Sequence, residues 1–158
     1  MDATYRIQDE PSPSGLSHLV VNPLWPMLAA MLAGAWLALP WFVLNSLALG
    51  SATRRREWLL AGVALPVTFL LLLGMGLLRT KGVVPEEAMP YLVVGLSVWK
   101  LTVAYLLLTL QQRSFALHEY FGGAVRNGMF VLLAGSFFGR GMVSKLLGPG
   151  LWSVLLVG

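Results

Sequence analysis

The sequence contains no cysteine, and this absence excludes disulfides, thiolate metal sites and thiol nucleophiles. Charged residues are also scarce: they make up 11% of the 158 residues, against about 25% in a typical soluble domain. Hydrophobic residues make up 57% of the chain, and its mean hydropathy is +0.74. A water-soluble fold is hard to reconcile with this composition.

The sequence also lacks the common catalytic motifs, namely HExxH, a glycine-rich phosphate loop and a GxSxG elbow. Ser114 and His118 are four residues apart and would share one face of a helix. Glu119 follows His118 directly and would point elsewhere, so these three residues lack the geometry of a nucleophile, a base and an orienting acid. We therefore expect no catalytic residue, no metal site, no cofactor and no enzymatic activity.

Long apolar segments predict an all-α integral membrane protein with a bundle of four transmembrane helices. Twenty apolar residues in a helix span about 30 Å, the thickness of the hydrocarbon core of a bilayer. A polar N-terminal tail, residues 1–18, would precede a transmembrane domain of residues 19–158. Its last segment, 151–158, is too short to cross and should lie at the interface or fold back against the bundle. The predicted spans are about 24–49, 58–78, 91–110 and 125–147.

The first span is longer than a straight crossing requires, so we expect it to tilt or bend. Pro40 predicts a kink, because proline removes a helix hydrogen bond and clashes with the preceding turn. Ala30, Gly34 and Ala38 recur every four residues and would let another helix approach closely. The same stripe is also compatible with ordinary membrane composition.

The fourth span is predicted to be glycine-rich and irregular. Gly135 and Gly139 form a GxxxG pair, which favours close helix packing. Arg140 and Lys145 interrupt the apolar run. This span is therefore the weakest of the four.

The net charge is +4, and the densest positive cluster is Arg54, Arg55 and Arg56, between the first two predicted spans. Such a cluster favours a cytoplasmic loop that contacts anionic lipid head groups. With four spans, both termini would then lie on the outer side of the membrane, opposite the cytoplasm, and we expect a bacterial inner (plasma) membrane. The scattered basic residues do not form a run suited to a nucleic-acid backbone.

Lys100 lies near the middle of the third predicted span, and Arg140 is a second cation within an apolar segment. A cation at such a depth costs roughly 2.5 to 3.5 kcal/mol on insertion scales. No acidic residue lies deep in any predicted span. Lys100 could extend toward the interface, meet an acidic residue of a partner protein, or attract an anion.

The sequence favours a non-enzymatic, small polytopic membrane protein that acts through assembly in the lipid bilayer, as a homo-oligomer or as a subunit of a larger membrane complex. The alternative is a small oligomeric channel or transporter for an anionic solute, and a membrane-embedded enzyme is a third reading. The position of Lys100 would separate the first two: a protein seam or lipid contact favours assembly, whereas a continuous cavity favours transport.

Overall fold

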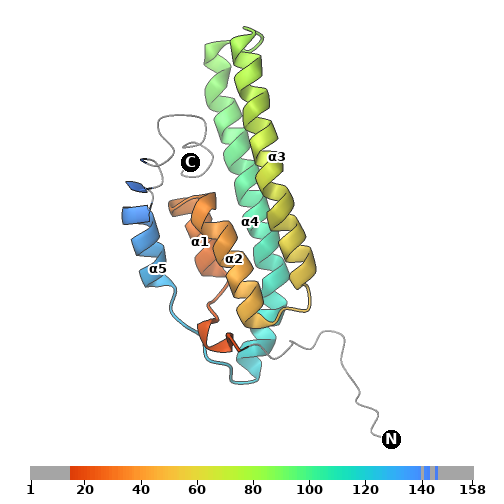
Figure 1. Cartoon of the computed structure of the whole chain (residues 1–158), viewed down its shortest axis with the longest axis vertical. Coiled ribbons are helices and arrows are strands. Elements are labelled where there is room, and N and C mark those ends of the chain that lie inside the picture. Colours follow the sequence, from red (N-terminus) through yellow and green to blue (C-terminus); the bar gives the residue numbers. More distant parts are fainter. Residues whose placement is uncertain (1–14, 140, 143–144, 146–158) are drawn as a thin grey trace, which may run out of the picture.

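The computed structural model describes residues 15–139, 141–142 and 145, and Figure 1 shows their arrangement. Within these residues the regular structure is helical, apart from one isolated parallel β-bridge between Val21 and Arg126. The elements in order are η1 (Ser17–Leu19), α1 (Leu24–Leu32), α2 (Ala35–Leu49), α3 (Arg54–Thr80), η2 (Glu86–Ala88), α4 (Met89–Tyr120), α5 (Met129–Ala134) and η3 (Gly135–Gly139).

Helices α3 and α4 are the long elements of the structure, with 27 and 32 residues, and they run side by side (Figure 1). Both are long and apolar enough to cross a membrane, and they contain the predicted spans 58–78 and 91–110. Helix α4 also continues through residues 111–120. Two of the four predicted spans therefore correspond to helices of spanning length in the described part of the chain.

The predicted first span is not one helix. Residues 24–49 form two shorter helices, α1 with 9 residues and α2 with 15, which pack against each other as a hairpin (Figure 1). Each is shorter than the roughly 17 to 25 residues of a membrane-crossing helix. The prediction of a single kinked span over these residues is therefore wrong.

The chain reverses at Gly34, whereas the sequence analysis predicted a bend at Pro40. Gly34 has φ 105° and ψ 176°, a conformation that is essentially restricted to glycine. Pro40 lies inside α2, which continues to Leu49. One missing hydrogen bond thus leaves α2 intact, while the backbone freedom of Gly34 permits the turn.

We call the end of the molecule where α2 meets α3 the base, and the turn at Gly34 the tip. Because the hairpin returns to its starting end, residues 18–21 lie at the base: the Val21 amide donates to Asn45 Oδ1 at 3.0 Å. The topology prediction, with the N-terminal tail and Arg54–Arg56 on opposite sides of a membrane, loses its basis. That prediction required residues 24–49 to cross.

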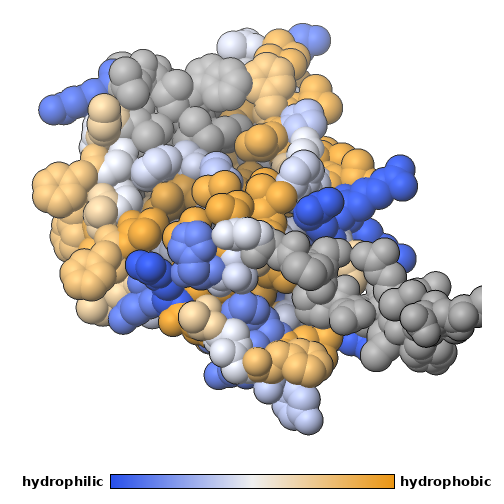
Figure 2. Space-filling view, turned by 60° about the horizontal axis from the view of Figure 1, so that its bottom comes forward, coloured by the Kyte–Doolittle hydropathy of each residue, from blue (hydrophilic) through white to orange (hydrophobic). Residues whose placement is uncertain are grey.

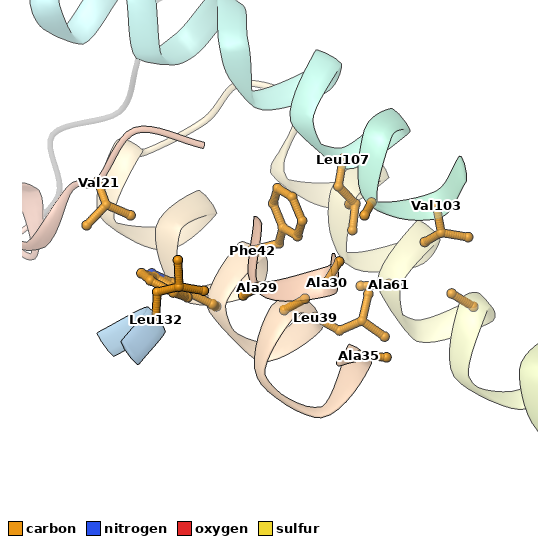
Figure 3. Close-up of a cluster of buried hydrophobic side chains, with 14 residues drawn as sticks. Val21, Ala29, Ala30, Ala35, Leu39, Phe42, Ala61, Val103, Leu107 and Leu132 are labelled. Carbon is orange, nitrogen blue, oxygen red and sulfur yellow. The ribbon is translucent and has the colours of Figure 1, made fainter. Parts of the chain in front are cut away.

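The hairpin packs against the base half of the α3–α4 pair, and Figure 1 shows both long helices extending well beyond the tip. Seven of the fourteen residues in the main apolar cluster are alanines. Small side chains let helix backbones approach closely. Larger side chains fill the centre, where Phe42 of α2 lies beside Leu107 of α4 (Figure 3).

The predicted fourth span, 125–147, begins later than expected. Residues 125–128 are not helical, and α5 starts at Met129 and passes into a π-helical turn, η3. Helix α5 and η3 contact α1. Residue 140 and most residues after it, including segment 151–158, lie outside the described part of the chain.

Candidate functional site

A buried polar cluster lies at the base of the bundle. Its centre is Glu57, in the first turn of α3, with only 1% of its surface exposed. Its carboxyl accepts hydrogen bonds from Ser51 Oγ at 2.5 Å, Thr53 Oγ1 at 2.6 Å and Gln111 Nε2 at 2.9 Å. A buried carboxyl is tolerated when hydrogen bonds replace its lost hydration. We call this group, with Asn45 and Ser114, the base cluster.

Gln111 of α4 connects the cluster to the hairpin and has no exposed surface. Its Nε2 donates to the Phe42 carbonyl at 2.7 Å as well as to Glu57, and its Oε1 accepts from Asn45 Nδ2 at 3.0 Å. Asn45 Oδ1 in turn accepts the amide of Val21. The cluster therefore joins α2, α3, α4 and the chain entering α1.

Ser114 joins the base cluster through Ser51, at 3.2 Å between the two Oγ atoms. His118 lies one turn further along α4, and its Nε2 is 3.2 Å from the carbonyl oxygen of Ala124. Ser114 therefore contacts the loop between α2 and α3, whereas His118 contacts the loop that follows α4. The described residues also contain no group of three or more His, Asp or Glu side chains that could hold a metal ion.

Lys100 lies near the tip of the hairpin. It is half-buried and borders a cavity of about 40 Å³, which we call the tip cavity. Small residues of the hairpin, including Ala30, Ala35 and Ala38, form one wall, and residues of α3 and α4 form the others. This volume holds only a few water molecules. Lys100 therefore lies at a seam between helices, and the cavity is too small to serve as a continuous pathway.

The polar lining of the tip cavity includes Ser97 and Thr68. Trp99 Nε1 donates to Thr68 Oγ1 at 3.0 Å, and Thr68 Oγ1 donates to the Ala64 carbonyl at 2.6 Å. Ser97 Oγ donates to the Val93 carbonyl at 3.0 Å. These hydroxyls satisfy carbonyls of their own helices, and the remaining lining is mainly apolar.

The predicted packing residues occupy three different environments. Ala30 and Ala38 are buried in the main apolar cluster, while Gly34 forms the hairpin turn. A Cβ atom built on Gly135 would lie 2.3 Å from Leu37 Cδ2, and one on Gly139 would lie 2.3 Å from the Trp36 ring. The two glycines therefore face α2 of the same chain.

The predicted lipid-contact residues Arg54, Arg55 and Arg56 are exposed at the base, in the first turn of α3. Figure 2, turned so that the base comes forward, shows hydrophilic side chains spread among hydrophobic ones at this end. Arg140, the second predicted intramembrane cation, lies outside the described residues.

The sequence analysis did not identify Glu57 or Gln111 as buried residues. Glu57 follows three arginines and Gln111 precedes Gln112 and Arg113, so both stand in segments that look like solvated helix ends. One signal was available: Thr53 and Glu57 are four residues apart, a spacing that brings side chains together at a helix start. No family model, curated protein or solved structure matches the chain.

Proposed function

We propose that the protein is a non-enzymatic integral membrane protein that acts by assembly, either with itself or as a subunit of a larger membrane complex. The observation that carries this proposal is how little of α3 and α4 the chain covers. In the most apolar windows of these helices, only 17% and 22% of the residues are buried. Wide apolar faces therefore remain for lipid and for other membrane helices.

We expect a partner helix to contact the exposed faces of α3 and α4 near the hairpin tip. Leu72 of α3 and Leu96 of α4 form a small buried cluster between the two long helices. Near the tip, Ala30 and Ala35 are buried against the rest of the chain, whereas Met31 and Leu32 are exposed. In a membrane, apolar burial alone gives no preference for protein over lipid, so a specific contact at the tip needs a polar or charged group.

At the hairpin tip, Lys100 favours partners that carry an acidic side chain. It lies eleven residues into α4, about 17 Å along the helix axis from its start. A cation at such a depth interacts strongly with a carboxylate, since the surrounding dielectric is low. We therefore propose that a helix carrying an acidic side chain docks beside Lys100 at the tip.

The substitution Lys100→Leu tests this proposal. Loss of one member of a buried ion pair costs about 3 to 5 kcal/mol, so Lys100→Leu should dissociate the assembly and leave membrane insertion intact. Lys81→Leu is the control, because Lys81 is an exposed cation at the end of α3. Mass measurement in native lipid reports assembly, and resistance to alkaline extraction reports insertion. An unchanged assembly mass for Lys100→Leu would contradict the proposal.

The second candidate function is an oligomeric channel or transporter for an anion. In this function the half-buried cation Lys100 attracts the anion, and the pathway forms between chains, because the tip cavity of one chain is only about 40 Å³. Anion flux into liposomes separates the two functions. If Lys100→Leu abolishes flux while the assembly mass stays unchanged, the transport function replaces the assembly function.

A further inference from the structure

A lateral groove of about 500 Å³ runs between α2 and α3 on the surface of the molecule. Tryptophans line it from both helices, Trp36 from α2 and Trp58 from α3. Between them lie the small or compact residues Pro40, Ala61 and Gly62. Among the described residues, no side chain occupies the space above Gly62, where an added Cβ atom would meet nothing within 4 Å. The missing side chain of Gly62 and the short one of Ala61 leave this space open on the α3 side.

The groove follows one face of each helix. On α3 its residues include Trp58, Gly62 and Leu65, which are spaced three and four apart. Seven residues of helix rise by about 10 Å, so the groove extends that far from the base toward the tip. Its lining is almost entirely apolar along this length.

Positive charge lies at the base end of the groove. The Arg54 guanidinium carbon is 5.8 Å from the centroid of the Trp58 ring, so the cation lies over a residue that lines the groove. Arg55 precedes Trp58 by three residues and Gly62 by seven, which places it on the same face of α3. Arg56, two residues before Trp58, belongs to a different face.

We propose that this groove binds one anionic phospholipid, with an acyl chain between α2 and α3 and the phosphate held by Arg54 and Arg55. An apolar channel with cations at one end is complementary to an apolar chain with an anionic head group. Guanidinium groups also bind phosphate oxygens in a bidentate manner. The proposal rests on the membrane location in the proposed function, and it requires neither assembly nor Lys100.

Filling the groove tests the acyl-chain site. The variant Gly62→Phe places a ring in the open space above Gly62. Gly74→Phe is the matched control, since Gly74 lies on the same helix, outside the groove, and also has nothing within 4 Å of an added Cβ. Each protein is purified in detergent with equal amounts of dioleoylphosphatidylglycerol and dioleoylphosphatidylcholine, and the retained lipids are identified by native mass spectrometry. Gly62→Phe should lose the retained phosphatidylglycerol, whereas Gly74→Phe should keep it.

The head-group contact is tested separately with Arg54→Gln, an exposed substitution that leaves the core unchanged. It should lower the preference for phosphatidylglycerol by about fivefold, the weight of one arginine near anionic lipid. Arg56→Gln should leave the preference as in the parent. If Gly62→Phe does not fold, the Arg54 and Arg56 variants still decide the question.

The same spectra report the oligomeric mass, so a failure of this proposal differs from a failure of the assembly function. Parental retention of phosphatidylglycerol by Gly62→Phe, or an equal loss in Gly74→Phe, would overturn the lipid site. If Gly62→Phe retains the lipid but has a reduced oligomeric mass, the groove binds a helix of another protein chain. That result would also overturn the lipid site.

Discussion

The base and the tip of the hairpin hold the same helices together by different means. At the base, Glu57 and Gln111 form a buried hydrogen-bond network that reaches three helices and the chain entering α1. At the tip, contacts are made by alanines around a small cavity bordered by Lys100. Hydrogen bonds fix directions and distances, whereas small apolar contacts fix only proximity. The base therefore specifies how the hairpin docks, whereas the tip is held in place less precisely.

Gln111→Leu should have the largest effect on stability, because it removes the hydrogen bonds that distinguish the base from the tip. The substitution would remove partners from Glu57 Oε2, Asn45 Nδ2 and the Phe42 carbonyl. Glu57 Oε2 and Asn45 Nδ2 would be left without a partner, while the Phe42 carbonyl keeps its bond within α2. Each such buried polar group costs about 1 to 3 kcal/mol, so the loss in unfolding free energy should be at least about 2 kcal/mol.

Gln112→Leu is the control for this experiment, because Gln112 is exposed on the next position of α4. It should change the unfolding free energy by less than about 0.5 kcal/mol. Both values are measured by denaturant unfolding in detergent. Equal stability of the two variants would show that the base cluster does not hold the hairpin.

A smaller effect is expected at the tip from Gly34→Ala. An alanine at φ 105° and ψ 176° would be strained by about 1 to 3 kcal/mol. In Gly62→Ala, the added methyl enters open space within a helix, and it should stabilise the protein by about 0.5 to 1 kcal/mol. Thermal unfolding of the two variants should therefore shift in opposite directions. A shift in the same direction would argue against a hairpin turn at Gly34.

Of the three destabilising variants, Gly135→Ala, where η3 meets α2 near the tip, should show the smallest loss of stability. The new methyl would collide with Leu37 Cδ2, and the other Leu37 atoms are at least 3.5 Å away. The Leu37 side chain can rotate, so we expect a loss of about 1 kcal/mol, the low end for overpacking. Gly74→Ala, with open space around the new methyl, provides the comparison. Equal melting temperatures would show that the contact between η3 and α2 is loose.

Several features of the fold could be predicted from residue types alone. The apolar runs around residues 58–78 and 91–110 predicted two long helices, and both are present because a run of that length has a strong helical preference and no breaker that stops it. Pro66 does not interrupt α3, as Pro40 does not interrupt α2. In both cases the flanking hydrogen bonds preserve the helix.

The hairpin could not be predicted in the same way, because a continuous helix through Gly34 would have the same composition. Glycine is compatible both with a helix and with a left-handed turn, and packing of α1 against α2 and α4 decides between them. The burial of Glu57 and Gln111 likewise depends on segments more than fifty residues apart meeting at the base.

The sequence by itself determined the helical character, the two long apolar helices and the cations at Arg54–Arg56 and Lys100, because these follow from composition and local spacing. Only the tertiary structure decided that residues 24–49 turn back, that Glu57 becomes the centre of a buried network, and that Lys100 borders a small cavity between helices. The physical reason is that hydrogen-bond partners and neighbouring helices are brought together by packing over long sequence distances, and local propensity carries no information about that packing.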